Sequence, residues 1–336
     1  MTGAVACFGE LLLRLTAPGR ELLLQRPHLD VHVGGAEANV AVGLASLGHQ
    51  ARVISTVPDN ALGNAAVGYL RRHGVDASGV TRTAGRMGLY FLAQGAGLRA
   101  SEIVYDREGS SFARALAGDF DWDRLLDGVD LLHLSGITPA LGPQSAEAAL
   151  AAADAAQRLG VPISFDGNYR AQLWERWDSR PREILGKLVS KARIMFGNHR
   201  DVGLLLGESF SGDGPDRRRQ AAEAAFKAFP TLQVIASTAR HIEDADRHRI
   251  SARIDTPDQS AQTDEVVVAG IIDRIGAGDA FATGVLHGLR SGRDLDWSVR
   301  SGLAVTALKH SLVGDASLFG PSDIDAFMSG ELDVRR

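Results

Sequence analysis

Cysteine is almost absent from this chain, because Cys7 is the only one among 336 residues. A lone cysteine cannot form an internal disulfide, and its place in the apolar run 5–8 predicts a buried thiol that packs as a small hydrophobic side chain. With one cysteine and ten scattered histidines, no structural zinc site is predicted. Hydrophobic residues make up 45% of the chain, which is enough to build a large core.

Long basic runs and long apolar runs are also missing. The formal net charge is −5 and the longest basic run is 217–219, so the electrostatic footprint of a nucleic-acid-binding protein is absent. No uninterrupted apolar segment is long enough to span a bilayer, and the residues before Glu10 lack the basic and apolar regions of a signal peptide. We therefore expect a cytoplasmic enzyme whose partners include neither nucleic acid nor a membrane.

What the chain does have is an alternation of short apolar runs with amphipathic or alanine-rich stretches. Buried strands are predicted at 52–57, 130–134, 162–166, 193–196 and 233–237. Helices that end at glycine or proline are predicted at 36–47, 60–73, 145–159 and 216–229. This alternation predicts an α/β fold with a mainly parallel central sheet covered by helices on both faces.

Two regions interrupt the alternation. Segments at about 11–33 and 88–112 have the pattern of strands without intervening helices, and they contain glycine-rich turn chemistry. Ligands bind at the carboxyl ends of the strands in open α/β sheets. We therefore expect a small β-sheet lid over those ends, within a single domain that spans 1–336.

The segment 273–281, with the sequence Asp-Arg-Ile-Gly-Ala-Gly-Asp-Ala-Phe, carries the most chemistry. Gly276, Ala277 and Gly278 allow backbone N–H groups to approach a phosphate, and the helix predicted to follow directs its positive end toward it. Asp279 would then accept a proton from an attacking hydroxyl. From these residues alone, an ordinary loop that ends in an Asp N-cap is about equally good.

A second candidate site is the segment 34–39, Gly-Gly-Ala-Glu-Ala-Asn. Two glycines before a predicted helix let backbone amides touch a small ligand, and Asn39 offers both a donor and an acceptor. The alternative is a tight strand-to-helix turn that binds nothing, which these residues alone favour by roughly two to one.

Together these segments resemble the ribokinase-like (PfkB) carbohydrate kinases. The family signature usually reads Asp-Thr-x-Gly-Ala-Gly-Asp-x-Phe, with Arg274 here in place of Thr, and its Gly-Gly-x-x-x-Asn-x-Ala pattern matches Gly34, Gly35, Asn39 and Ala41. A closer resemblance, to 2-keto-3-deoxygluconate kinases, rests on segments 9–10, 88–92, 103–111, 134–141, 165–170 and 307–311. Six separated motifs in order are far more specific than one glycine-rich loop.

The resemblance implies a three-layer α/β/α sandwich, the use of ATP and Mg²⁺, and phosphorylation of the terminal (6-) hydroxyl of 2-keto-3-deoxygluconate. It implies that Asp279 is the base and that Gly276, Ala277 and Gly278 stabilise the phosphoryl oxygens. Implied substrate residues are Gly34, Gly35, Asn39, Tyr90, Tyr105, Arg107 and Arg170. Implied nucleotide residues are Asn198, Thr238, Arg240, Gly276, Gly278 and Lys309, and Asn198 with Asp201 would help to hold Mg²⁺ through water.

Two of the implied substrate residues favour a sugar acid. The guanidinium groups of Arg107 and Arg170 can grip a carboxylate, and a neutral sugar would leave them unpaired at about 1–3 kcal/mol. The alternative for each is a surface ion pair, Arg107 with Asp106 or Glu108 and Arg170 with Asp166, and without the resemblance that alternative is preferred. The two tyrosines, as isolated residues, are more often packing groups.

The nucleotide side departs from the family pattern. Asn198 and Asp201 replace the usual Asn-x-x-Glu, and a purely structural role as helix cap is the alternative. Segment 237–242 lacks the usual glycines, which leaves Thr238 and Arg240 to contact the phosphates.

Other roles follow from the resemblance or compete with it. Lys309 is predicted to border the adenine pocket, with a solvated helix face as the alternative. A homodimer or higher homo-oligomer is implied by family analogy. The competing functions are a kinase of the same family for a neutral sugar such as fructose, and a non-catalytic sugar-acid-binding protein. Retention of Asp279 argues against the latter, because a pure binder needs no base.

Overall fold

A ten-stranded sheet forms the centre of the computed structural model, which describes residues 3–177 and 179–330. The strand order is β13-β12-β11-β10-β9-β8-β1-β4-β5, and β14 pairs with β12. From β5 to β11 neighbouring strands are parallel, whereas β12 pairs antiparallel with β11, β13 and β14. The strands are β1 (Ala4–Phe8), β4 (Ala51–Pro58), β5 (Asp76–Thr83), β8 (Val129–Ser135), β9 (Ile163–Asp166), β10 (Ile194–Phe196), β11 (Val234–Ile242), β12 (Arg247–Asp255), β13 (Ser260–Gln262) and β14 (Val266–Ala269).

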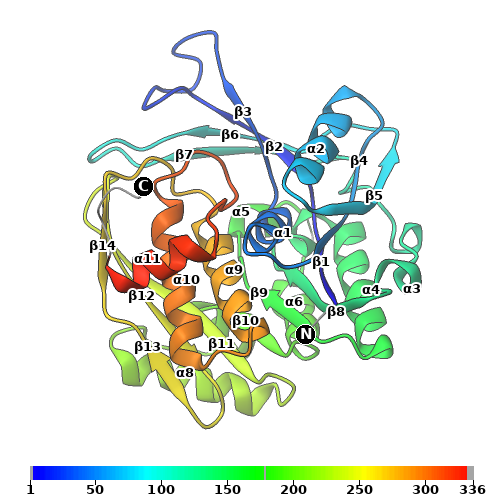
Figure 1. The fold of residues 1–336 in the computed structure, drawn as a ribbon. Coiled ribbons are helices and arrows are strands. Elements are labelled where there is room, and N and C mark those ends of the chain that lie inside the picture. The colour runs from blue at the N-terminus through cyan, green and yellow to red at the C-terminus, as the bar shows by residue number, and fades with distance from the viewer. Residues whose placement is uncertain (1–2, 178, 331–336) are drawn as a thin grey trace.

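Helices cover both faces of this sheet (Figure 1). The longer ones are α1 (Ala36–Ser46), α2 (Ala61–Arg72), α4 (Pro143–Leu159), α6 (Pro181–Val189), α7 (His199–Leu206), α8 (Pro215–Ala228), α9 (Ala277–Arg290), α10 (Leu295–Lys309) and α11 (Pro321–Ser329). Short turns of helix are η1 (Ala117–Asp119), α3 (Trp122–Leu125), η2 (Pro139–Leu141) and α5 (Ala171–Trp174). The predicted α/β fold is confirmed, and each predicted strand and helix is present with ends shifted by a few residues.

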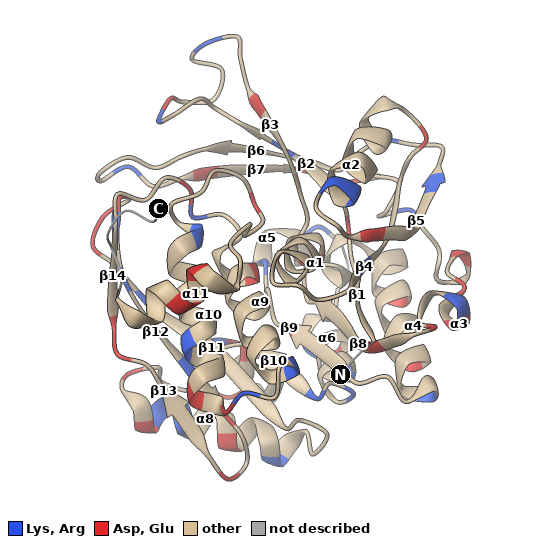
Figure 2. Ribbon diagram, in the orientation of Figure 1, with Lys and Arg blue, Asp and Glu red and all other residues tan. Residues whose placement is uncertain are grey.

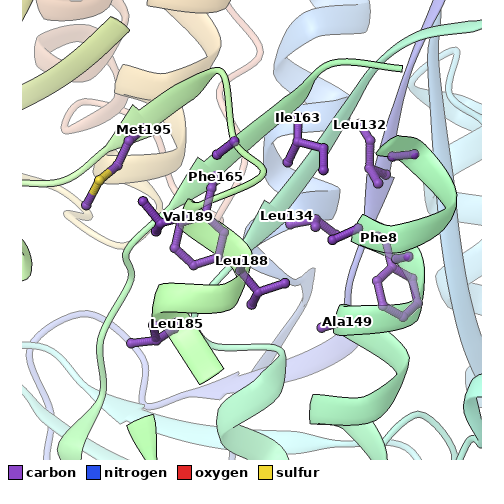
Figure 3. Close-up of a cluster of buried hydrophobic side chains, with 14 of the residues drawn as sticks. Phe8, Leu132, Leu134, Ala149, Ile163, Phe165, Leu185, Leu188, Val189 and Met195 are labelled. Carbon is purple, nitrogen blue, oxygen red and sulfur yellow. The ribbon is translucent and has the colours of Figure 1, made fainter. Parts of the chain in front are cut away.

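The alternation of side chains along β1 divides the core into two halves. Phe8 joins a cluster with α4 and α6 on one face, where Figure 3 shows it with Leu132, Phe165 and Leu188. Cys7 joins the cluster with α1 and α9 on the other face, and burial raises the pKa of its thiol. The prediction of a buried thiol is therefore confirmed.

The charged residues lie mainly on the outside. Figure 2 shows basic and acidic residues interspersed on α8, whereas β1 carries no charge. In the described ranges, no helix combines the length and the hydrophobicity that a membrane crossing requires.

A smaller sheet lies over one end of the large one (Figure 1). Its order is β3-β2-β6-β7, from β2 (Leu12–Thr16), β3 (Asp30–Gly34), β6 (Leu89–Ala93) and β7 (Glu102–Asp106). Strands β2 and β6 pair in parallel, which joins the two regions that interrupt the alternation. The sequence thus predicts both the existence of this sheet and the segments that build it.

Candidate active site

A cavity of about 740 Å³ lies between the smaller sheet and the carboxyl ends of the main strands. Asp166, Phe196 and Thr238 reach it from β9, β10 and β11, and the first turn of α9 forms another wall. The smaller sheet contributes Leu12, Tyr90, Ile103 and Tyr105. This is the position at which open α/β sheets bind ligands.

The glycine-rich turn makes the start of α9 accessible from this cavity. Gly276 is the N-cap with a φ of 79°, and a side chain there would collide with the backbone oxygen of Asp315. Only glycine adopts this positive φ without strain and also lacks the Cβ atom that would collide. Helix α9 begins at Ala277, so Gly278 and Asp279 lie within its first turn, whose N–H groups have no intrahelical acceptors. The interpretation of Asp279 as an N-cap is therefore wrong, since the cap is Gly276.

Asp279 faces the cavity beside Asn39, whose Nδ2 donates to the carboxylate Oδ2 at 2.7 Å. Burial raises the pKa of Asp279 to about 8; the Asn39 hydrogen bond opposes the shift, and the nearby Asp166 carboxylate adds to it. Burial also raises the pKa of Asp166, to about 7, and Asp201 adds to that rise. The cavity thus holds a carboxyl group that is poised to exchange a proton near neutral pH.

A buried ion network anchors the glycine-rich turn to the smaller sheet. The guanidinium of Arg14 on β2 donates to Asp273 at 2.6 Å and forms an ion pair with Asp315 at 3.0 Å. Tyr90 donates to the other oxygen of Asp315 at 2.6 Å. The backbone N–H of Ile275 donates to Asp273. No sequence argument found this network, although a basic residue in the apolar run 11–16 is a signal that could have done so.

The two glycines at the start of α1 have different roles. Gly35 lines the cavity with a φ of 141°, and a side chain there would collide with the backbone oxygen of Glu10. Gly34 does not line the cavity, and a side chain there would collide with the Asp315 carboxylate. The prediction of a substrate contact therefore needs correction for Gly34, which makes room for the ion network instead.

Tyr90, Tyr105, Arg107 and Arg170 all line the cavity. The surface ion pairs considered for Arg107 do not form, because its side chain is buried against Glu10, and Asp106 pairs with Arg86 instead. Arg170 is exposed and donates to the carbonyl of Tyr169 at 3.0 Å, and within the described residues it has no carboxylate within ion-pair distance.

Asn198 and Asp201 form a capping box at the start of α7. The Asn198 Oδ1 accepts from the N–H of Arg200 at 2.8 Å, and the Asp201 Oδ2 accepts from the N–H of Asn198 at 2.7 Å. The capping interpretation is therefore confirmed. Both side chains also line the cavity, where burial raises the pKa of Asp201.

These residues fit a hydrated magnesium ion. No group of three or more His, Cys, Asp or Glu residues that could hold a metal occurs in the part of the chain that the structure describes. Asp166 and Asp201 nevertheless repel each other at the cavity wall. Mg²⁺ commonly binds through one or two carboxylates, water and substrate phosphates, and a cation of this kind would relieve the repulsion.

On the nucleotide side, Thr238 and Arg240 line the cavity as predicted, but Lys309 does not. Lys309 is fully buried at the end of α10, and its ammonium donates to the carbonyl oxygens of Leu312 at 2.9 Å and Asp273 at 3.3 Å. The prediction that it borders an adenine pocket is wrong, because the side chain turns inward beneath the glycine-rich turn. Two cavity residues that sequence reasoning did not assign are Arg200 and Arg274.

Comparison with known proteins gives one consistent result. Residues 3–318 match the family described as pfkB family carbohydrate kinase. A crystal structure of 2-dehydro-3-deoxygluconokinase from Thermotoga maritima is 34% identical and superposes with a TM-score of 0.93, covering 98% of this chain and 100% of that one. A pfkB family carbohydrate kinase from Listeria grayi is 36% identical with a TM-score of 0.90, covering 97% and 99%.

A curated relative extends the comparison. The 2-dehydro-3-deoxygalactonokinase of Haloferax volcanii is 29% identical over 330 residues, which is 98% of both chains. These similarities run the length of the fold and include the strands and turns that build the cavity. The chain belongs to the pfkB family of carbohydrate kinases.

Proposed function

We propose that this carbohydrate kinase transfers a phosphoryl group from ATP to the terminal 6-hydroxyl of 2-keto-3-deoxygluconate. The observation that carries the proposal is Arg170, an exposed arginine in the same cavity as Asp279, which has no carboxylate within ion-pair distance in the described residues. Its charge attracts Asp166 and Asp201 from a longer distance, so its guanidinium donors remain available for a substrate carboxylate. The names of the relatives, which are kinases of deoxy sugar acids, support the same substrate class.

Different groups in the cavity carry out different parts of the proposed reaction. Asp279 takes the proton from the substrate hydroxyl, and Asn39 holds that carboxylate in place through its 2.7 Å hydrogen bond. The N–H groups at the start of α9 donate to phosphoryl oxygens as negative charge develops on them. The family uses ATP with Mg²⁺, and the metal supplies neutralising charge at the nucleotide phosphates. Strands β2, β6 and β7 cover one side of the cavity, where their side chains would exclude water during the transfer.

A substrate panel tests the proposal. We expect ADP release with Mg-ATP and ketodeoxygluconate or ketodeoxygalactonate, and much slower release with gluconate, fructose or ribose. Turnover confined to fructose or ribose would support the neutral-sugar kinase instead. Binding of the keto acids by calorimetry without any ADP release would support a non-catalytic binding protein.

Replacing Arg170 with Gln is expected to lower kcat/KM for the ketodeoxy acid by about 10 to 100-fold, because charge-assisted hydrogen bonds to the carboxylate are lost. The rate with a poor neutral substrate should change little. Arg180→Gln is the matched control, since Arg180 is exposed and, among the described residues, forms an ion pair with Glu183 alone, across one helical turn. Equal losses for acidic and neutral substrates would contradict the role of Arg170.

The pH dependence follows from the base. Asp279 must lose its proton to act, and burial raises its pKa to about 8. We therefore expect kcat/KM to increase with pH and to level off above about pH 8. In Asp166→Asn the rise should move to lower pH, because the neighbouring negative charge that raises the Asp279 pKa is gone. A flat profile between pH 6 and 9 in both proteins would rule out this assignment of the base.

A further inference from the structure

Arg274 has no counter-ion in the described part of the chain. It is half-buried at the cavity wall, and no ion pair or side-chain hydrogen bond connects it to a neighbouring residue in those ranges. A charge removed from water is normally paired. Among the described residues, each buried arginine has a carboxylate partner: Arg14, Arg107, Arg253 and Arg290.

The nearest carboxylate along the chain is already occupied. Asp273 accepts from Arg14 and from the backbone N–H groups of Ile275 and Gly314. Burial is the main cause that lowers the pKa of Arg274, and the attraction of Asp273 only partly opposes it. The guanidinium of Arg274 is thus a cation held ready for an anion that the protein itself does not supply.

Arg274 shares the cavity with two further arginines, Arg170 and Arg240. Burial lowers the pKa of Arg240, on β11, and the pKa of Arg274. The charge of Arg274 lowers the pKa of Arg240 further, and the charge of Arg170 lowers the pKa of Arg274 further. Arg240 and Arg170 thus each repel Arg274, and all three line the cavity. Arg240 is on the proposed nucleotide side and Arg170 on the proposed sugar-acid side.

We propose that Arg274 is a catalytic residue that binds the phosphoryl group in transit between ATP and the sugar hydroxyl. The inference rests on the proposed kinase function and adds a new role to it. The bond between the γ-phosphorus and its bridging oxygen breaks, and the electron pair stays on ADP. A bond forms from the sugar oxygen to phosphorus, and the proton of that hydroxyl goes to Asp279. Arg274 neutralises charge on the phosphoryl oxygens during this exchange.

The position of Arg274 beside the glycine-rich turn suits this role. Gly276 and Gly278 present N–H donors at the start of α9, two and four residues after Arg274. A planar guanidinium adds a forked pair of charged donors to that set. Arg240, on the proposed nucleotide side, would hold the part of the triphosphate that does not move.

Kinetic variants test the proposal. In Arg274→Gln we expect kcat to fall by about 100-fold or more, with the KM for the sugar acid changed less than threefold. Arg240→Gln should instead mainly raise the KM for ATP. Guanidinium ion at millimolar concentration should partly restore kcat in Arg274→Ala and not in Arg240→Ala, a response that a structural defect would not give. Unchanged kcat in Arg274→Gln, or no rescue of a folded Arg274→Ala protein, would overturn the proposal.

A binding measurement separates this proposal from the choice of sugar. Calorimetry with inorganic tripolyphosphate needs no sugar, and Arg274→Gln should bind it at least tenfold more weakly than the wild type. Weaker binding of tripolyphosphate by Arg274→Gln would support Arg274 as a phosphate ligand even if the wild type turned over no sugar. The absence of turnover would then contradict the proposed function alone. Equal binding by the two proteins would overturn the role of Arg274. Arg274→Lys, which keeps the charge, should retain most of this binding and is the control for folding.

Discussion

Asp279→Asn is expected to lower kcat by about 10³-fold, which is within the usual contribution of a general base. Asn is nearly the same shape and can still accept the hydrogen bond from Asn39, but its amide cannot take up the proton of the sugar hydroxyl. The measurement is the coupled ADP-release assay at saturating ketodeoxygluconate and Mg-ATP. The KM for the sugar acid should stay within a few-fold of wild type, because Asp279 contributes to the proton transfer more than to binding.

The same variant should be more stable than the wild type at high pH. The folded-state pKa of Asp279 is raised above that of an unfolded aspartate, so the fold favours the protonated form. This contribution is fully present below about pH 4 and is lost as the pH rises through about 8. Melting temperatures of the two proteins at pH 6 and pH 9 should therefore diverge in favour of the variant. A variant that is less stable at pH 9, or that retains more than a tenth of wild-type kcat, would contradict the assignment.

Arg14→Met is expected to reduce the free energy of unfolding by about 3–5 kcal/mol, because it leaves two buried carboxylates without their cation. Arg14 is fully buried between Asp273 and Asp315, so water cannot replace it without disrupting the packing. Urea denaturation followed by circular dichroism gives the free energy. The variant should also lose activity at temperatures where it is still folded, since the turn that carries Gly276 is anchored through Asp273.

Arg290→Met is the matched control. Arg290 is also buried and pairs with Asp130, but it lies at the end of α9 remote from the cavity. It should lose a similar amount of stability while the folded fraction keeps its kcat. If the two variants lose activity in equal proportion to their stability, the Arg14 network would have no specific role in positioning the turn.

The sequence predicts the elements of the fold well because their signals are local. Apolar runs, helix-ending glycines and the interruptions at the lid strands each lie within about 20 residues, and the structure places them as expected. The antiparallel strands β12 to β14 were not predicted. The sequence of strand β12 has neither a continuous apolar run nor a clean alternation of apolar and polar residues, because Arg249, Arg253 and Asp255 interrupt it. The folded chain tolerates these charges because each forms an ion pair with a residue that is near or distant in the sequence.

The residues that line the cavity were predictable where a motif fixes their position and not where packing does. Asp279 and Asn39 belong to separate motifs, and the fold brings them within hydrogen-bonding distance. The partners of Arg14 and Arg107 are distant in sequence, so no local pattern identifies them. The position of Lys309 was predicted wrongly for a related reason. Its side chain turns toward the carbonyl groups of two loops, and only the folded chain brings these loops together.

The contact between Asn39 and Asp279 has a consequence for biosynthesis. The two residues are 240 positions apart in the chain, and Asp315 must also be in place before Gly276 and Arg14 acquire their neighbours. Contacts of such long sequence separation require both segments of the chain to be present, and their loop-closure entropy is lost before the contact forms. A nascent chain on the ribosome therefore carries the proposed sugar-side residues long before Asp279 and the glycine-rich turn are present. We expect the emerging polypeptide to consume no ATP until Asp315 has been synthesised.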